Sequence, residues 1–85
     1  AGFGVSGNSY SGNTLIGHHT GYGITTGSYN LLLGYQAGDA LTSGSHNIVI
    51  GYNTDAPSAT GDYQLNIGNT IYGDLSNGNI GFMTS

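Results

Sequence analysis

At 85 residues the chain can form one small domain, and with 17 glycines, four Asp, and no Lys or Arg it carries a net charge of −4. Without basic side chains to contact phosphates or anionic lipid headgroups, nucleic-acid binding is excluded, and no apolar run approaches the ~18 residues that membrane insertion needs. The absence of Cys excludes disulfides and thiolate metal sites, and a composition rich in Gly, Asn, Ser and Thr, with no 3.6-residue apolar stripe, disfavours helices.

A repeat of 17 residues runs through the chain. Its clearest block is a polar residue, three mostly apolar residues and a glycine, which occurs as NTLIG, NLLLG, NIVIG and QLNIG, ending at Gly17, Gly34, Gly51 and Gly68. Such a block predicts a short strand that ends where the glycine permits a positive φ. One strand per short, fixed period is typical of a β-solenoid. We therefore expect an all-β fold, a β-solenoid or β-helix of five 17-residue coils that forms a single domain over residues 1–85, as a fragment of a longer fibre chain.

The polar residue that opens each block predicts a structural ladder. This column consists of Asn13, Asn30, Asn47 and Gln64. Side-chain amides that stack about 4.8 Å apart hydrogen-bond to one another along the axis of a cross-β structure. The alternative is that each residue of the column only begins a turn.

Both faces of the central strands are apolar, which predicts more than one chain. Alternation along a strand places neighbouring residues on opposite faces, and we expect the last residue before each glycine to fill the core: Ile16, Leu33, Ile50 and Ile67. A narrow coil buries only its inner face, so the middle residues are the expected interface: Leu15, Leu32 and Val49. The chain also has little aliphatic surface for a core of its own. We expect a homotrimer with intertwined or side-by-side copies; a capping loop or domain outside this sequence is the alternative.

The repeat weakens towards the C-terminus. Asn66 replaces an apolar residue, Pro57 interrupts the preceding loop, and the block at residues 78–81 is shortened to GNIG. Proline cannot donate a hydrogen bond to a ladder. The sequence therefore predicts that the solenoid ends, or that the fold changes, in this region.

The titratable residues are expected to have structural roles, with no enzymatic activity, cofactor or metal. Asp39 and Asp74 lie in Gly-rich turns, where Asp favours turn geometry. Asp55 and Asp62 flank a Pro-containing turn and are the one pair in which a β-helix enzyme could place two carboxylates for carbohydrate cleavage. Adjacent histidines on a strand point to opposite faces, so a metal site would need one His from each chain at a three-fold axis.

Aromatic residues form two further columns in the repeat. One contains Tyr29, His46 and Tyr63, and the other contains His18, Tyr35 and Tyr52. A tyrosine ring has an apolar face and a polar tip, which suits stacking on sugars. The candidate contacts to a cell-surface glycan are Tyr29, His46, Tyr63, Tyr35 and Tyr52. The alternative is that the rings pack on one another or across the oligomer interface.

Three segments resemble repeats of known fibres. Residues 24–38 (ITTGSYNLLLGYQAG) and 43–54 (SGSHNIVIGYNT) resemble repeat segments of bacteriophage and prophage tail fibres. Residues 65–82 (LNIGNTIYGDLSNGNIGF) resemble the segment that leads toward an endosialidase-type intramolecular chaperone in many such fibres. The Asn-x-x-Ile-Gly rhythm is also similar to head repeats of trimeric autotransporter adhesins.

The resemblance implies a trimeric β-structured fibre segment on a virion or outside the cell. Such a segment would be a rigid shaft or knob that presents a receptor-binding tip to the host, and the resemblance supplies no catalytic residue. The alternative is a subunit of a bacterial or environmental extracellular adhesin or filament.

Overall fold

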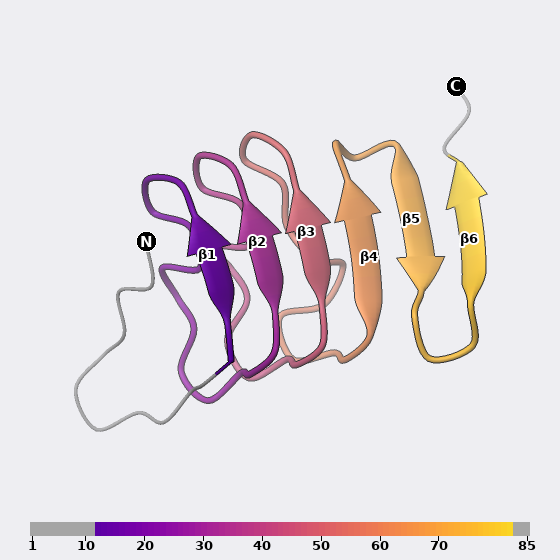
Figure 1. Cartoon of the computed structure of the whole chain (residues 1–85), viewed down its shortest axis with the longest axis horizontal. Helices are drawn as coiled ribbons and strands as arrows, with labels where there is room; N and C mark the ends of the chain where they lie inside the picture. The colour runs from indigo at the N-terminus through magenta and orange to yellow at the C-terminus, as the bar shows by residue number, and fades with distance from the viewer. Residues whose placement is uncertain (1–11, 83–85) are drawn as a thin grey trace.

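The computed structural model describes residues 12–82, whose strands form a single sheet (Figure 1). The strands are β1 (Thr14–Ile16), β2 (Leu31–Leu33), β3 (Ile48–Ile50), β4 (Gln64–Ile67), β5 (Ile71–Asp74) and β6 (Asn79–Phe82), and they lie in the sheet in chain order. The described residues contain no helix, and therefore none that is long and apolar enough to cross a membrane. The predicted all-β fold class is confirmed.

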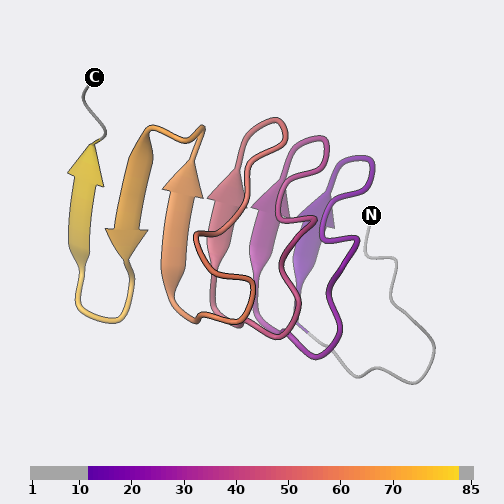
Figure 2. The same cartoon turned by 180° about the vertical axis from the view of Figure 1, so that it is seen from behind.

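The first four strands form a parallel half-sheet. Each pairs with the next at an offset of 17 residues, as in Leu31↔Ile48 and Ile48↔Leu65. Between strands the chain returns behind the sheet in a loop, as Figures 1 and 2 show from opposite sides, because parallel strands need a crossover connection. The returning segments keep the same offset: Thr25 N–H donates to Thr42 O at 3.1 Å, and Thr42 N–H to Ala59 O at 2.9 Å.

The first three strands end at glycines, as the sequence predicts. Gly17, Gly34 and Gly51 have φ angles of 130°, 125° and 130°, a region that side chains with a Cβ rarely adopt. A Cβ on Gly34 would lie 2.7 Å from the carbonyl oxygen of Gly51. Glycine is therefore required at this corner both by the backbone angle and by the close approach of the next repeat.

After β4 the fold changes, and the expectation of five coils is corrected here. Strand β4 pairs antiparallel with β5, and β5 pairs antiparallel with β6, so a hairpin replaces the fifth coil. Gly68 and Asn69 have φ angles of 61° and 58°, and successive positive φ angles reverse a chain tightly. The weakening of the repeat near Asn66 correctly predicted a change of fold. Residues 1–11 of the expected first coil, and residues 83–85 of the expected single domain, lie outside the described residues.

The apolar core lies between the parallel strands and the returning loops. Leu32 and Val49 enter it from β2 and β3, and both are fully buried. Ile24, Ala37 and Leu41 enter it from the loops and are at most 1% exposed. The sheet and the stacked loops thus form two walls around one narrow core.

The predicted faces of the strands are inverted. Leu32 and Val49, expected at an interface, fill the core, and Leu15 packs against it. Ile16 and Leu33, expected in the core, are 57% and 39% exposed. Of the other expected core residues, Ile50 and Ile67 are only half-buried, so they too lie outside the buried cluster.

The physical reason for the inversion is the buried amide before each central strand. Asn30 and Asn47 are 1% and 0% exposed, so their side chains occupy the interior. Alternation then places the residues two positions later, Leu32 and Val49, on the same inner side.

Candidate functional site

The predicted column Asn13, Asn30, Asn47 and Gln64 forms a continuous hydrogen-bonded ladder inside the chain. Each Asn Oδ1 accepts the main-chain N–H of the next member, at 2.9, 2.8 and 2.7 Å in chain order. Amide-to-amide bonds also occur, since Asn30 Nδ2 and Gln64 Nε2 donate to the preceding Oδ1 at 3.1 and 3.2 Å. The ladder therefore joins side chains mainly to the backbone of the following repeat, and it fixes the register between repeats.

The amide nitrogens bind the corners of the following repeat. Asn30 Nδ2 donates to Gly44 O and Asn47 Nδ2 to Gly61 O, both at 3.0 Å. Among the described residues, no buried side-chain nitrogen or oxygen lacks a hydrogen-bond partner. Because a buried polar group without a partner costs about 1–3 kcal/mol, the satisfied ladder is compatible with a stable interior.

Gln64 ends the ladder differently from the asparagines. Its Nε2 donates to Gly61 O and to Ser58 O, both at 2.9 Å, and its Oε1 accepts from Ser58 N at 2.8 Å. The additional methylene lets the amide fold back onto the loop of its own repeat. The last amide of the column is thereby satisfied within the chain.

The opposite side of the sheet carries two apolar rows, which together we call the outward face. The strand register aligns one row from Ile16 through Leu33, Ile50, Ile67 and Ile71 to Phe82, and the other from Thr14 through Leu31, Ile48, Leu65 and Gly73 to Ile80. Ile80 and Phe82 are 58% and 70% exposed. The sequence predicts an apolar interface face, but with the wrong residues. The structure places there the row expected in the core, Ile16, Leu33, Ile50 and Ile67, in place of Leu15, Leu32 and Val49.

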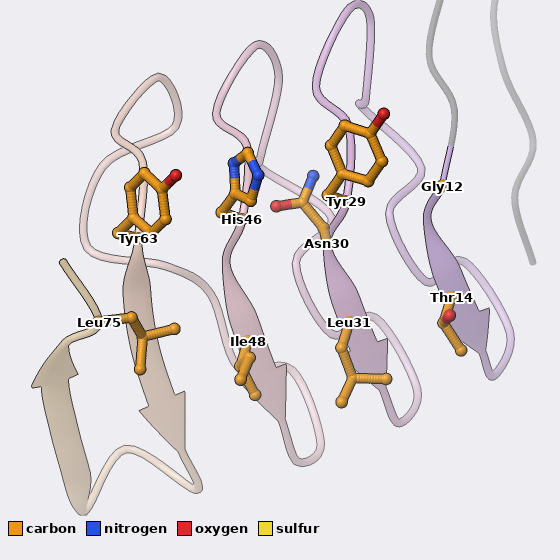
Figure 3. Close-up of a pocket in the computed structure, with 9 residues that line it drawn as sticks. All are labelled: Gly12, Thr14, Tyr29, Asn30, Leu31, His46, Ile48, Tyr63 and Leu75. Atoms are coloured by element: carbon orange, nitrogen blue, oxygen red, sulfur yellow. The ribbon is translucent and has the colours of Figure 1, made fainter. Parts of the chain in front are cut away.

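An aromatic row borders the outward face at the start of the strands. Tyr29, His46 and Tyr63 have φ angles of 58–61°, and their rings stack with centroids 5.2 and 4.6 Å apart. Between these rings and the residues Leu31 and Ile48 runs a shallow groove of about 460 Å³ (Figure 3). The three residues with strained, positive φ angles thus lie along the edge of an exposed apolar surface.

The ring geometry bears on the candidate glycan contacts. Tyr35 and Tyr52, in the second aromatic row, stack with centroids 5.7 Å apart and an angle of 11° between rings. Inside each row the ring faces are turned toward the neighbouring rings, as the alternative expects, whereas sugar stacking needs a free face. Among the described residues, Tyr52 and Tyr63, at the row ends, have a ring neighbour on one side only, and a glycan contact stays a prediction.

The carboxylates lie away from the two outward rows. Asp39, Asp55 and Asp62 lie in the loops between strands, whereas Asp74, expected in a turn, is the last residue of β5. Asp55 Oδ1 accepts Ala40 N at 3.1 Å, and Asp62 Oδ1 accepts Ser45 N at 2.8 Å, so each ties its loop to the preceding repeat. Hydrogen bonds from Ser76 lower the pKa of the Asp74 carboxyl.

The Asp39 carboxyl is the one whose pKa shift opposes its ionisation. Burial raises this pKa, and the nearby charge of Asp55 raises it further.

His18 and His19 stack on each other with ring centroids 4.1 Å apart. Within residues 12–82, no three or more His, Asp or Glu side chains are grouped so that they could hold a metal ion.

No known protein family, curated protein or solved structure matches this chain.

Proposed function

We propose that this chain is a structural segment of an extracellular fibre of the phage tail-fibre type. In this proposal the 17-residue repeats form a rigid β-solenoid, and copies associate through the outward face as a homotrimer that carries a receptor-binding tip. The observation that supports this most strongly is the combination of an internal hydrogen-bonded ladder with an exposed apolar outward face.

Rigidity is supported by hydrogen bonds that join successive repeats on every side of the core. Besides the strands, the turns after them are linked: Gln36 N–H donates to His18 O at 2.9 Å, and Asn53 N–H donates to Tyr35 O at 2.7 Å. Bending the repeat stack would stretch several of these bonds together. A mechanical spacer needs this resistance to bending, whereas a catalytic site needs a concave arrangement of reactive groups.

Association is supported by the composition of the outward face. Large exposed apolar side chains gather there, including Ile16, Leu33, Ile80 and Phe82, and none of the four carboxylates belongs to its two rows. Contiguous apolar patches on soluble proteins mark interaction sites. The location on a virion or outside the cell, with host attachment as the role, is supported by the resemblance of residues 24–38 and 43–54 to tail-fibre repeats.

Sedimentation equilibrium of the chain tests the proposed assembly. We expect a mass three times the 8.6 kDa of one copy, and a particle that remains at 8.6 kDa at millimolar concentration would overturn the proposal. Antibodies against the chain should label short appendages on phage particles in electron micrographs. Labelling of unbroken filaments on cells would instead support an adhesin or filament subunit.

A further inference from the structure

The β5–β6 hairpin extends the sheet beyond the apolar core. The inward row of the sheet changes from Val49 to the polar Asn66, whose Nδ2 donates to Asp55 O at 2.7 Å and to Asn69 Oδ1 at 3.0 Å. The buried core cluster includes no residue of the hairpin. The core therefore ends at β4, and it does not explain why the hairpin is ordered.

The apolar side of the hairpin is its outward side. Ile71, Ile80 and Phe82 continue the two outward rows across β5 and β6. A Cβ added to Gly73 would lie 3.1 Å from Leu65 Cδ2 and 3.4 Å from Ile80 Cγ1, so these two apolar side chains flank Gly73. A hairpin that served only to cap the core would have its apolar side chains on the inward face. Ile80 and Phe82 stay 58% and 70% exposed although the hairpin is paired with β4, so this apolar surface calls for a partner on the outward side.

We propose that the outward side of the β5–β6 hairpin is the principal self-association site, and that it packs around the three-fold axis of the proposed trimer against the outward faces of the other copies of this chain. This inference rests on the proposed function and specifies where its interface lies. The chain has four acidic and no basic side chains apart from three His, and the acids lie off the outward rows. Two copies can therefore meet through this surface without placing carboxylates against each other.

The outward face as a whole exposes close to the area that such a contact needs. A large side chain exposes about 200 Å² when fully accessible. Ile16, Leu33, Ile80 and Phe82 are 39–70% exposed, which gives on the order of 450 Å², about 250 Å² of it from the two hairpin residues. The bordering Tyr29 and Tyr63 bring the total of the six to roughly 650 Å², and the half-buried members of the rows add to it. A stable interface buries roughly 800 Å² on each partner. Phe82 is the most exposed of the six, and aromatic residues are frequent hot spots of interfaces.

Sedimentation velocity on two variants tests the site. The double variant Ile80→Ser, Phe82→Ser should weaken association about 30-fold or more, the effect of losing an interface hot spot. Tyr52→Ser is the matched control, because Tyr52 is 74% exposed, like Phe82 at 70%, but belongs to neither outward row. The far-ultraviolet circular dichroism of both variants should remain that of a folded β protein, because neither variant removes a residue of the buried core cluster.

A crosslinking experiment gives an independent readout that leaves the aromatic ring of Phe82 in place. The chain has no Cys, so Ile80→Cys introduces a single thiol on the outward face, and Tyr52→Cys places one elsewhere. Mild oxidation should join copies through Ile80→Cys and leave the control monomeric on a denaturing gel. An oligomeric wild type whose assembly survives the double variant and whose Ile80→Cys form does not crosslink would overturn this inference alone. A monomeric wild type would overturn the proposed function as well.

Discussion

Replacing Asn47 with Ala removes one member of the internal ladder and should unfold the protein more easily. The change deletes the Oδ1 atom that accepts from Gln64 N at 2.7 Å and the Nδ2 atom that donates to Gly61 O at 3.0 Å. Asn47 is 0% exposed, so its surroundings cannot supply water in exchange without opening the core. Gly61 O keeps its bond from Gln64 Nε2, whereas Gln64 N loses its acceptor. About 1–3 kcal/mol for the unpaired Gln64 N–H, together with the cavity that the truncation leaves, gives an expected loss of about 3 kcal/mol.

This loss is a large fraction of the total stability. At about 0.1 kcal/mol per residue, a chain of 85 residues has a free energy of unfolding of about 8 kcal/mol. For a urea m-value of about 1.5 kcal/mol/M, the midpoint of unfolding should fall by about 2 M. Tyrosine fluorescence reports the transition, since the chain has seven Tyr and no Trp.

Ser43→Ala is the control for this measurement, because Ser43 is an exposed residue of a returning segment and such changes stay within about 0.5 kcal/mol. All variants are compared at one chain concentration, since the stability of an oligomer depends on it. If Asn47→Ala shifts the midpoint no more than Ser43→Ala does, the ladder is not a source of stability and the reasoning fails.

Two further predictions concern backbone geometry and charge. Gly38→Ala should lower the free energy of unfolding by about 3 kcal/mol in thermal unfolding, because Gly38 has a φ of 63° and a Cβ there would lie 2.7 Å from Leu32 Cδ1. Gly78→Ala should lower it by only about 1 kcal/mol, because Gly78 has a φ of 79° but open space around it. Equal losses would contradict the packing argument. The raised pKa of Asp39 means that the folded chain binds this proton more tightly than the unfolded chain, so stability should fall as pH rises from the ordinary value of 3.8 through the raised one. Asp39→Asn removes the repulsion between the Asp39 and Asp55 carboxylates. Urea midpoints should show the variant to be more stable than the wild type at pH 7 and similar to it near pH 3. An equal gain in stability at both pH values would refute the electrostatic cause.

The 17-residue period of the fold can be predicted from the sequence, but apolar alternation alone does not show which residues of each strand face inward. Glycines at fixed spacing mark where the strands end, and the Asn column marks where the repeats are joined. Leu31, Leu32 and Leu33 are all apolar, so alternation alone cannot say which of them points inward. The signal that decides the inward residue is Asn30: a stacked amide is most stable when enclosed, and Leu32 lies on its side of the strand.

The antiparallel hairpin and the strained ring row are harder to predict. Asn66 and the Gly68-Asn69 pair signal a change of direction, but which strands pair afterwards depends on the tertiary arrangement. Positive φ angles at Tyr29, His46 and Tyr63 run against local preference, because bulky residues rarely adopt this region. Stacking between neighbouring rings offsets part of that cost, and it exists only once the repeats are in register.

The way in which Gln64 folds back has a consequence for growth at this end of the stack. A parallel array whose last amide remained free would offer a template to the first repeat of any other copy, as the tip of an amyloid fibril does for incoming chains. Gln64 instead uses its amide donor and acceptor on Ser58 and Gly61, and β5 covers the edge of β4 by antiparallel pairing. The folded-back amide and the strand reversal after Ile67 together deny an incoming repeat a parallel template at β4.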